Sequence, residues 1–87
     1  MKVTKRNGNV VLYDDEKVAN SIVWANGRTR GEVVTIKTAE MIADEVFRRL
    51  TSEKDLITTK EIQACVCAVL IERGFPQTAE NYLHYKG

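Results

Sequence analysis

Two cationic side chains, Lys5 and Arg6, stand next to each other near the start of the chain, and a third, Lys17, follows within the same short segment. Arginine presents a planar fork of N–H donors and lysine a compact charge, and both suit the oxygens of a phosphate group. Exposed strands also carry Lys and Arg, because charge discourages pairing with other chains. Two alternatives therefore stay open for Lys5 and Arg6, a solvated strand and a clamp for a polyphosphate.

Lys17 lies where a cation is slightly disfavoured. The acidic run Asp14 to Glu16 is typical of a helix N-cap and first turn, where carboxylates accept backbone N–H bonds and complement the helix dipole. Either Lys17 pairs with these carboxylates in solvent, or it joins Lys5 and Arg6 around the free N–H groups of a helix start. The second arrangement is the usual recipe for an anion site.

The composition excludes several classes of function. Eighty-seven residues make one small domain, and a net charge of +1 gives no global attraction to nucleic acid or an anionic membrane. The longest apolar run is too short to span a bilayer, and the N-terminus lacks an apolar signal region. We therefore expect a cytoplasmic domain whose anion site, if it has one, is local.

The histidine and cysteine content predicts neither a metal site nor a catalytic site. Cys65 and Cys67, the only cysteines, point in different directions on a helix and are expected to be small buried apolar residues. His84 is the only histidine, and Glu80 four residues earlier suggests a surface pair at most.

The first twelve or so residues predict a β-hairpin. The dipeptide Asn7-Gly8 favours a two-residue turn in which both residues have positive φ. Such a turn pairs Thr4 with Val11 and Val3 with Leu12. It also fixes which residues share a face, and one face is then formed by Val3, Lys5, Val10 and Leu12.

Four helices are expected after the hairpin, at about 15–25, 38–50 and 60–73 and from Pro76 onward. Residues 56–58 suggest a short strand. Thr58 with Glu61 fits a capping box, and Thr59 is a competing cap. The third helix is apolar on most sides and is expected in the middle of a bundle, and Tyr82 and Tyr85 are expected in the core. The outcome is an α+β fold, mostly α, in which a small sheet joins a four-helix unit.

The segment V-T-K-R-N-G, followed by Tyr13-Asp14-x-x-Lys17-Val18, resembles the opening signature of the ATP-cone. This is a nucleotide-binding regulatory domain of many ribonucleotide reductase catalytic subunits and of a related bacterial transcriptional repressor. The later segments ITTKEIQACVCAVLIERG and TAENYLHYK resemble the third and last helices of that family. The resemblance implies a four-helix bundle capped by a three-stranded sheet, with residues 1–87 as a single cone domain at the N-terminus of a larger protein.

The resemblance also implies a site for ATP or dATP as an allosteric effector, with Mg²⁺ accompanying the triphosphate. Lys5 and Arg6 face the phosphates, and Asp14 approaches the adenine amino group. Thr59 and Gln63 approach the ribose or the phosphates. The complete set of residues so implied is Val3, Lys5, Arg6, Asp14, Lys17, Val18, Thr59 and Gln63.

Two positions depart from the pattern of some relatives. Val11 stands where an acidic residue faces the base, and Gln63 stands where a histidine occurs, so base recognition through the first is lost or moved. The leading hypothesis is a regulatory module of a ribonucleotide reductase. Its partners are then the adenine nucleotide, the catalytic domain of the parent enzyme and other subunits, with no nucleic acid and no membrane. The alternatives are a degenerate cone that acts only in oligomerisation and the nucleotide sensor of a repressor. The repressor is disfavoured, because no zinc-ribbon cysteines precede the signature.

Overall fold

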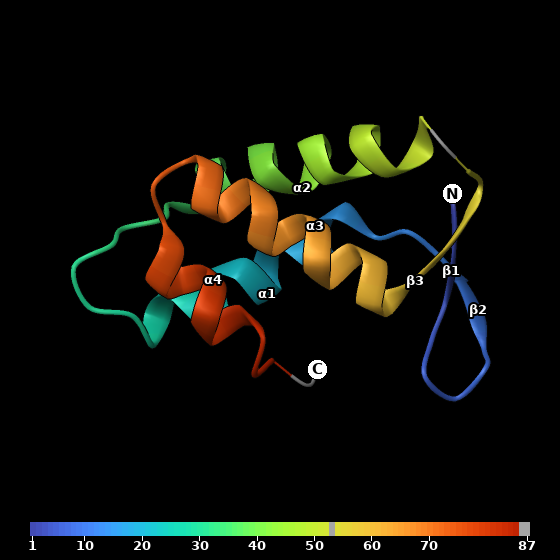
Figure 1. The fold of residues 1–87 in the computed structure, drawn as a ribbon, viewed down its shortest axis with the longest axis horizontal. Coiled ribbons are helices and arrows are strands. Elements are labelled where there is room, and N and C mark those ends of the chain that lie inside the picture. The colour runs from blue at the N-terminus through green and yellow to red at the C-terminus, as the bar shows by residue number, and fades with distance from the viewer. Residues whose placement is uncertain (53, 86–87) are drawn as a thin grey trace.

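The computed structural model describes residues 1–52 and 54–85, and within these ranges the chain forms four helices and three short strands (Figure 1). The helices pack together, and the small sheet lies at one end of the bundle beside the N-terminus. The elements are, in chain order, β1 (Lys2–Thr4), β2 (Val10–Leu12), α1 (Asp15–Gly27), α2 (Ile36–Thr51), β3 (Leu56–Thr58), α3 (Thr59–Glu72) and α4 (Pro76–Tyr82). The predicted fold class, a mostly helical α+β domain, is confirmed.

The sheet is mixed, with β1 in the centre. β2 pairs with β1 antiparallel, and β3 pairs with β1 in parallel, so that Val3 lies opposite both Val11 and Ile57. Because α3 begins directly after β3, this parallel pairing brings the start of α3 next to the end of β1. The predicted strand at 56–58 is confirmed.

The predicted hairpin register is wrong by one residue. Thr4 pairs with Val10 instead of Val11, since the turn has three residues rather than two. The Gly8 N–H donates to the Lys5 carbonyl and the Lys5 N–H donates to the Asn9 carbonyl, while only Gly8 has positive φ, at 87°. These are the features of a type I turn followed by a left-handed glycine, the usual three-residue hairpin. Asn7 instead accepts a bond from the Asn9 N–H through its side chain.

The shifted register reverses the faces of the second strand, because side chains alternate along a strand. Val11 joins Val3 and Tyr13 on the side of the helices, whereas Val10 and Leu12 are 53% and 73% exposed. The predicted face made of Val3, Lys5, Val10 and Leu12 does not form.

Local signals place the helix starts well. Asp14 caps α1 by accepting a bond from the Lys17 N–H, as its position in the acidic run predicts. Thr58 and Glu61 form the predicted capping box of α3, so Thr59 is the first helical residue and not the cap. Pro76 opens α4. Helix α2 begins two residues before the predicted start, because Thr35 caps it through a bond from the Thr38 N–H.

The core lies between the four helices and the inner face of the sheet. Ile22, Ile42, Val66 and Leu70 are fully buried, and Ile57 joins the sheet to them. The prediction that α3 lies in the middle of the bundle is wrong. One face of α3 is open to solvent, where Ala64 and Ala68 are exposed and Ile71 is 57% exposed.

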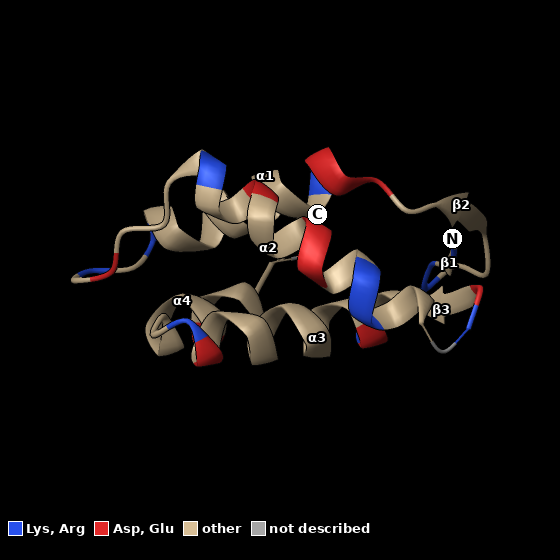
Figure 2. Cartoon of the chain, turned by 90° about the horizontal axis from the view of Figure 1, so that it is seen from above, with Lys and Arg blue, Asp and Glu red and all other residues tan. Residues whose placement is uncertain are grey.

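Ion pairs join α2 to the end of α3 on the surface, and Figure 2 marks the charged positions along the ribbon. Arg49 contacts both Glu45 of its own helix and Glu72 of α3, and Arg73 contacts Glu45 at 3.0 Å. The hydrogen bond from Arg73, with the second bond from Arg49, holds the pKa of Glu45 below its ordinary value despite partial burial. Exposed pairs contribute little individually, and this cluster adds mainly to the alignment of the two helices.

Candidate functional site

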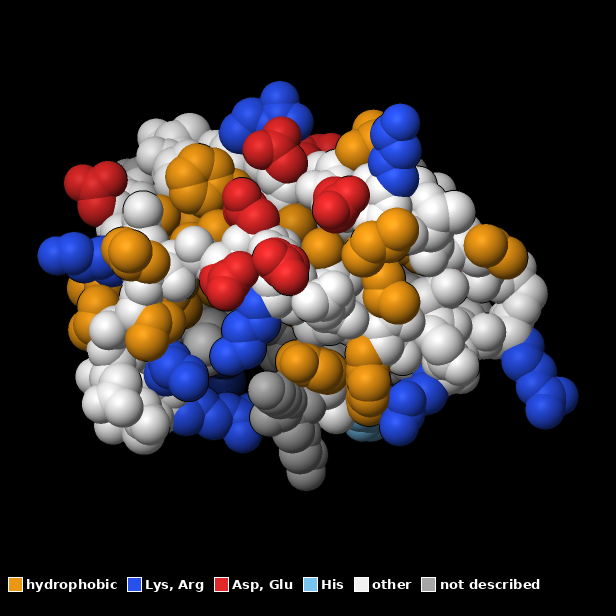
Figure 3. Space-filling view, turned by 180° about the vertical axis from the view of Figure 1, so that it is seen from behind, with side chains coloured by type: hydrophobic (Ala, Val, Ile, Leu, Met, Phe, Trp, Pro, Cys, Tyr) orange, Lys and Arg blue, Asp and Glu red, His pale blue; other side chains and the backbone are white. Residues whose placement is uncertain are grey.

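A cavity of about 530 Å³ opens between the sheet and helices α1, α3 and α4. In the space-filling view, basic side chains gather around a hollow on one face of the molecule, with acidic side chains on one side of it (Figure 3). Its walls come from segments that lie far apart in the sequence. The lining residues are Val3, Lys5, Arg6, Asn7, Val11, Leu12, Tyr13, Asp14, Lys17, Val18, Ser21, Thr59, Lys60, Ile62, Gln63, Tyr82 and Tyr85.

All of the residues that the ATP-cone resemblance assigns to a nucleotide line this cavity. Val3 comes from β1, and Lys5 and Arg6 come from the hairpin loop. Asp14, Lys17 and Val18 come from the start of α1, and Thr59 and Gln63 come from the first two turns of α3. The fold therefore brings three separate segments to one cavity, and the contact of each residue with a ligand stays a prediction.

The turn explains how Lys5 and Arg6 serve the same cavity. Neighbouring residues of a regular strand point to opposite faces, which would separate the two side chains. Strand β1 ends at Thr4, however, and Arg6 lies inside the turn that the bond from Gly8 to Lys5 closes. Strand alternation no longer applies at Arg6, and both cations line the cavity.

The start of α3 adds a third cation to this end of the cavity. Lys60 lines the cavity and also a smaller adjoining hollow of about 220 Å³, which Lys5 and Arg6 share. The capping box occupies the N–H groups of Thr58 and Glu61. The N–H groups of Thr59 and Lys60, in the first turn, have no partner within the helix. The sequence did not indicate Lys60 as a site residue, because only the parallel pairing of β1 with β3 brings it beside the hairpin.

The start of α1 supplies one more cation and a carboxylate. The Asp14 carboxylate accepts the Lys17 N–H at 3.1 Å through Oδ1, so one of its oxygens serves the helix cap. Next to it, partial burial raises the pKa of Asp15, and the nearby carboxylates of Asp44 and Asp14 raise it further. The acidic run therefore has a structural role that is independent of any ligand.

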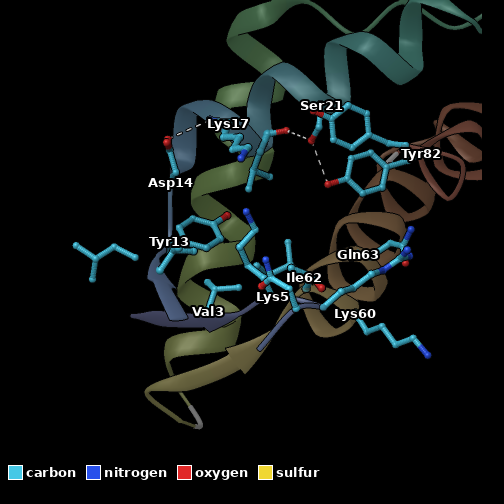
Figure 4. A pocket seen from close by; sticks show the side chains of 17 residues that line it. Val3, Lys5, Tyr13, Asp14, Lys17, Ser21, Lys60, Ile62, Gln63 and Tyr82 are labelled. Carbon is cyan, nitrogen blue, oxygen red and sulfur yellow. Dashed lines mark hydrogen bonds between the residues drawn. The ribbon is translucent and has the colours of Figure 1, made fainter. Parts of the chain in front are cut away.

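Two hydroxyl groups and several apolar side chains complete the lining. Ser21 and Tyr82 lie at one end of the cavity with their hydroxyl oxygens 3.1 Å apart (Figure 4), and Val18 and Ile62 also line it. Tyr82 is buried, as predicted, and it also lines the cavity. Ser21 was missed, since a serine within a helix carries no signal that separates a lining residue from a surface one.

Tyr13 forms a wall with its ring. Its hydroxyl donates to the Ala43 carbonyl at 2.8 Å, and its ring lies 5.3 Å from that of Phe47. Burial raises the pKa of the Tyr13 phenol, and the nearby Asp15 raises it further, so the phenol stays protonated and bonded to α2.

A carboxylate from a distant loop positions α4, which carries Tyr82. The helix has no side-chain cap of its own. Glu32 replaces it, because its two oxygens accept the N–H groups of Gln77 and Thr78 at 3.0 and 2.8 Å. Burial raises the pKa of Glu32, but these N–H groups and the Thr78 hydroxyl outweigh it and hold the pKa below its ordinary value. Asn26 ties the same loop to Thr78.

The two positions that depart from some relatives both lie at the cavity. Val11 is 43% exposed and lines it from β2, so the corrected register places Val11 on the side of the site. Gln63 also lines it, and the Gln63 amide donates to the Leu83 carbonyl at 3.3 Å, which bridges α3 to the end of α4. Within residues 1–52 and 54–85, no His, Cys, Asp and Glu side chains gather into a metal-binding group, and no helix is long and apolar enough to cross a membrane.

Comparison with known families gives one match. The family model of the ATP cone domain matches residues 1–87, the whole chain. No individual curated protein is similar enough to count as a match. ATP-cone domains are regulatory, have no catalytic activity of their own, and bind ATP or dATP as effectors. With the match over its full length and with the four-helix and three-strand architecture in place, the chain belongs to the ATP-cone family.

Proposed function

We propose that the cavity binds ATP or dATP and that this binding controls the overall activity of a ribonucleotide reductase. The observation that carries the proposal is the convergence of Lys5, Arg6, Lys17, Thr59 and Gln63, from separate segments, on one cavity. A volume of about 530 Å³ lies within the range of small-molecule sites, roughly 300–1,000 Å³.

The distribution of charge along the cavity supports one orientation of the nucleotide. Lys5, Arg6 and Lys60 gather where the hairpin loop meets the start of α3, so the triphosphate lies at that end, and Mg²⁺ enters with the phosphates that coordinate it. The base then lies toward Val18, away from these cations. In this orientation Thr59 and Gln63, which also line the cavity, approach the ribose.

Regulation requires more than binding. ATP and dATP differ only at the ribose 2′ position, so they have opposite effects only if each stabilises a different arrangement of helices or subunits. In this proposal the adenine nucleotide is the effector, and the catalytic domain of a cytoplasmic parent reductase and its other subunits receive the change. The domain itself carries out no reaction.

Isothermal titration calorimetry with ATP, dATP and ADP tests the binding step. We expect saturable heat for the wild-type chain and its loss, by tenfold or more in Kd, in the double variant Lys5→Ala/Arg6→Ala, because two charge-assisted contacts disappear. The matched control is Lys37→Ala/Arg30→Ala, which removes the same two residue types from exposed positions outside the cavity. Its net charge therefore equals that of the Lys5→Ala/Arg6→Ala variant.

The titration also separates the proposal from its alternative. Val11 and Gln63 favour a degenerate cone that keeps the fold for subunit contacts, because one lacks an acidic group and the other bonds to Leu83. A folded wild-type chain that gives no heat with any adenine nucleotide at millimolar concentration refutes the nucleotide site and supports this alternative. Equal weakening by the control double variant would show that net charge alone attracts the ligand.

A further inference from the structure

The proposed function assigns no role to two buried hydroxyl groups at one end of the cavity. Ser21 of α1 is 3% exposed and Tyr82 of α4 is 6% exposed, yet both line the cavity. Figure 4 shows the hydroxyl of Tyr82 directed toward that of Ser21 at one end of the cavity, whereas Val3, Lys5 and Lys60 lie at the other. Buried polar groups that face a cavity require partners, and their donors and acceptors can be counted.

The count leaves only acceptors facing the cavity. The Ser21 hydroxyl donates its one proton to the Val18 carbonyl, which is 2.6 Å away and has no proton to give. The bond between Ser21 and Tyr82, at 3.1 Å, therefore uses the proton of Tyr82. Both protons are then committed inside the protein, and the remaining lone pairs of the two oxygens are free to accept from a ligand.

The pair stays in this state at neutral pH. Burial raises the pKa of the Tyr82 phenol. The phenol therefore keeps its proton. A neighbouring ring, that of Tyr85, lies stacked at 6.2 Å from Tyr82 and limits the rotation of the Tyr82 side chain.

We propose that Ser21 and Tyr82, in place of Asp14, whose Oδ1 already caps α1, select an aminopurine by accepting a hydrogen bond from its 6-amino group. The inference rests on the proposed nucleotide site and specifies the base that this site takes. Adenine has an amino group at that position, which donates. Hypoxanthine has a carbonyl oxygen there, which only accepts and faces two other acceptors without a proton between them. The site thereby compensates for Val11, which has no polar group to recognise the base.

The test compares ATP with inosine triphosphate, in which a carbonyl oxygen replaces the 6-amino group and N1 carries a proton. Calorimetric titration of the wild-type chain with each is expected to give a Kd for inosine triphosphate higher on the order of tenfold or more. Tyr82→Phe removes an acceptor and is expected to weaken ATP. Ser21→Ala frees the Tyr82 proton to donate to a carbonyl and is expected to strengthen inosine triphosphate. Both changes lower the ratio of the two Kd values toward one.

The control is Tyr13→Phe, which removes a hydroxyl from another cavity tyrosine whose proton goes to Ala43 on α2. This variant is expected to keep the wild-type ratio. Each substitution removes one oxygen, and circular dichroism checks that the helices remain. A ratio near one in the wild-type chain, or a ratio that neither Ser21→Ala nor Tyr82→Phe changes, overturns the selection by the pair while the nucleotide site itself stands. Absence of ATP binding refutes the nucleotide site instead.

Discussion

Removing the side chain of Asn26 tests how the loop before α2 is held against α4. Its amide nitrogen donates to the Glu32 carbonyl at 2.9 Å and to the Thr78 hydroxyl at 3.1 Å, and its amide oxygen accepts the Val34 N–H at 3.0 Å. Asn26→Ala therefore deletes three hydrogen bonds and leaves the N–H of a buried valine without its partner.

The expected cost follows from that count. Each bond contributes about 1 kcal/mol net, and alanine regains roughly 0.6 kcal/mol through its helix propensity, so the free energy of unfolding is expected to fall by about 2–3 kcal/mol. For a domain of this size, that corresponds to a drop in Tm of roughly 10–20 °C. Urea unfolding followed by circular dichroism measures the free energy, and thermal scans measure Tm.

Asn20→Ala is the matched control for Asn26→Ala. Asn20 lies in the same helix and is exposed, so its replacement is expected to be neutral or slightly stabilising. If the free energy of unfolding of Asn26→Ala lies within about 0.5 kcal/mol of that of Asn20→Ala, then the hydrogen bonds of Asn26 do not hold the loop against α4, and this explanation of how α4 is positioned is refuted.

Three further predictions concern the elements that carry the cavity. Gly8→Ala is expected to lower the free energy of unfolding in urea by about 1 kcal/mol, because Gly8 has a φ of +87°. Gly27→Ala, at a helical position, is expected to be neutral or stabilising, and equal effects of the two substitutions would contradict the three-residue turn. Ile57→Ala is expected to cost about 2–5 kcal/mol, since the side chain is 1% exposed, and a cost no larger than that of Leu56→Ala, at 52% exposure, would argue against a buried inner sheet face. Because the folded pKa of Glu32 is lowered, the stability that its charge contributes is present above the ordinary carboxyl pKa of about 4.3 and is lost as the pH falls through the lowered value. Glu32→Gln is therefore expected to be less stable than wild type at about pH 7, and the difference is expected to narrow below about pH 4. A difference in stability that does not change with pH would disprove the charged cap.

Local signals in the sequence predicted the elements and most helix starts. Asp14, the Thr58–Glu61 box and Pro76 act on residues within one turn, so a short segment contains the whole interaction. The hairpin register failed because Asn7-Gly8 also fits a turn in which Gly8 alone is left-handed, and the pairing of β1 with β3 contributes to the choice. Local preference could not separate the two turns.

In the candidate site too, local sequence signals identified some residues, and long-range contacts determined the others. The signature around Lys5 and Arg6 located the hairpin side of the cavity, and its later segments located Thr59 and Gln63. Lys60, Ser21 and the cap that Glu32 provides for α4 depend on contacts between residues far apart in the chain, which no local pattern contains. The solvent-exposed face of α3 is a similar case, since its apolar composition alone predicted burial on all sides.

The central position of β1 has a consequence for the order of events during synthesis. Val3 is made well before its parallel partner Ile57 and the cavity residue Tyr82. A nascent chain that has not yet extended beyond α4 lacks one wall of the cavity, so it cannot hold the ligand there. Because a ligand that binds only the complete fold stabilises it, a nucleotide bound at the proposed site would favour finished domains over partly synthesised ones.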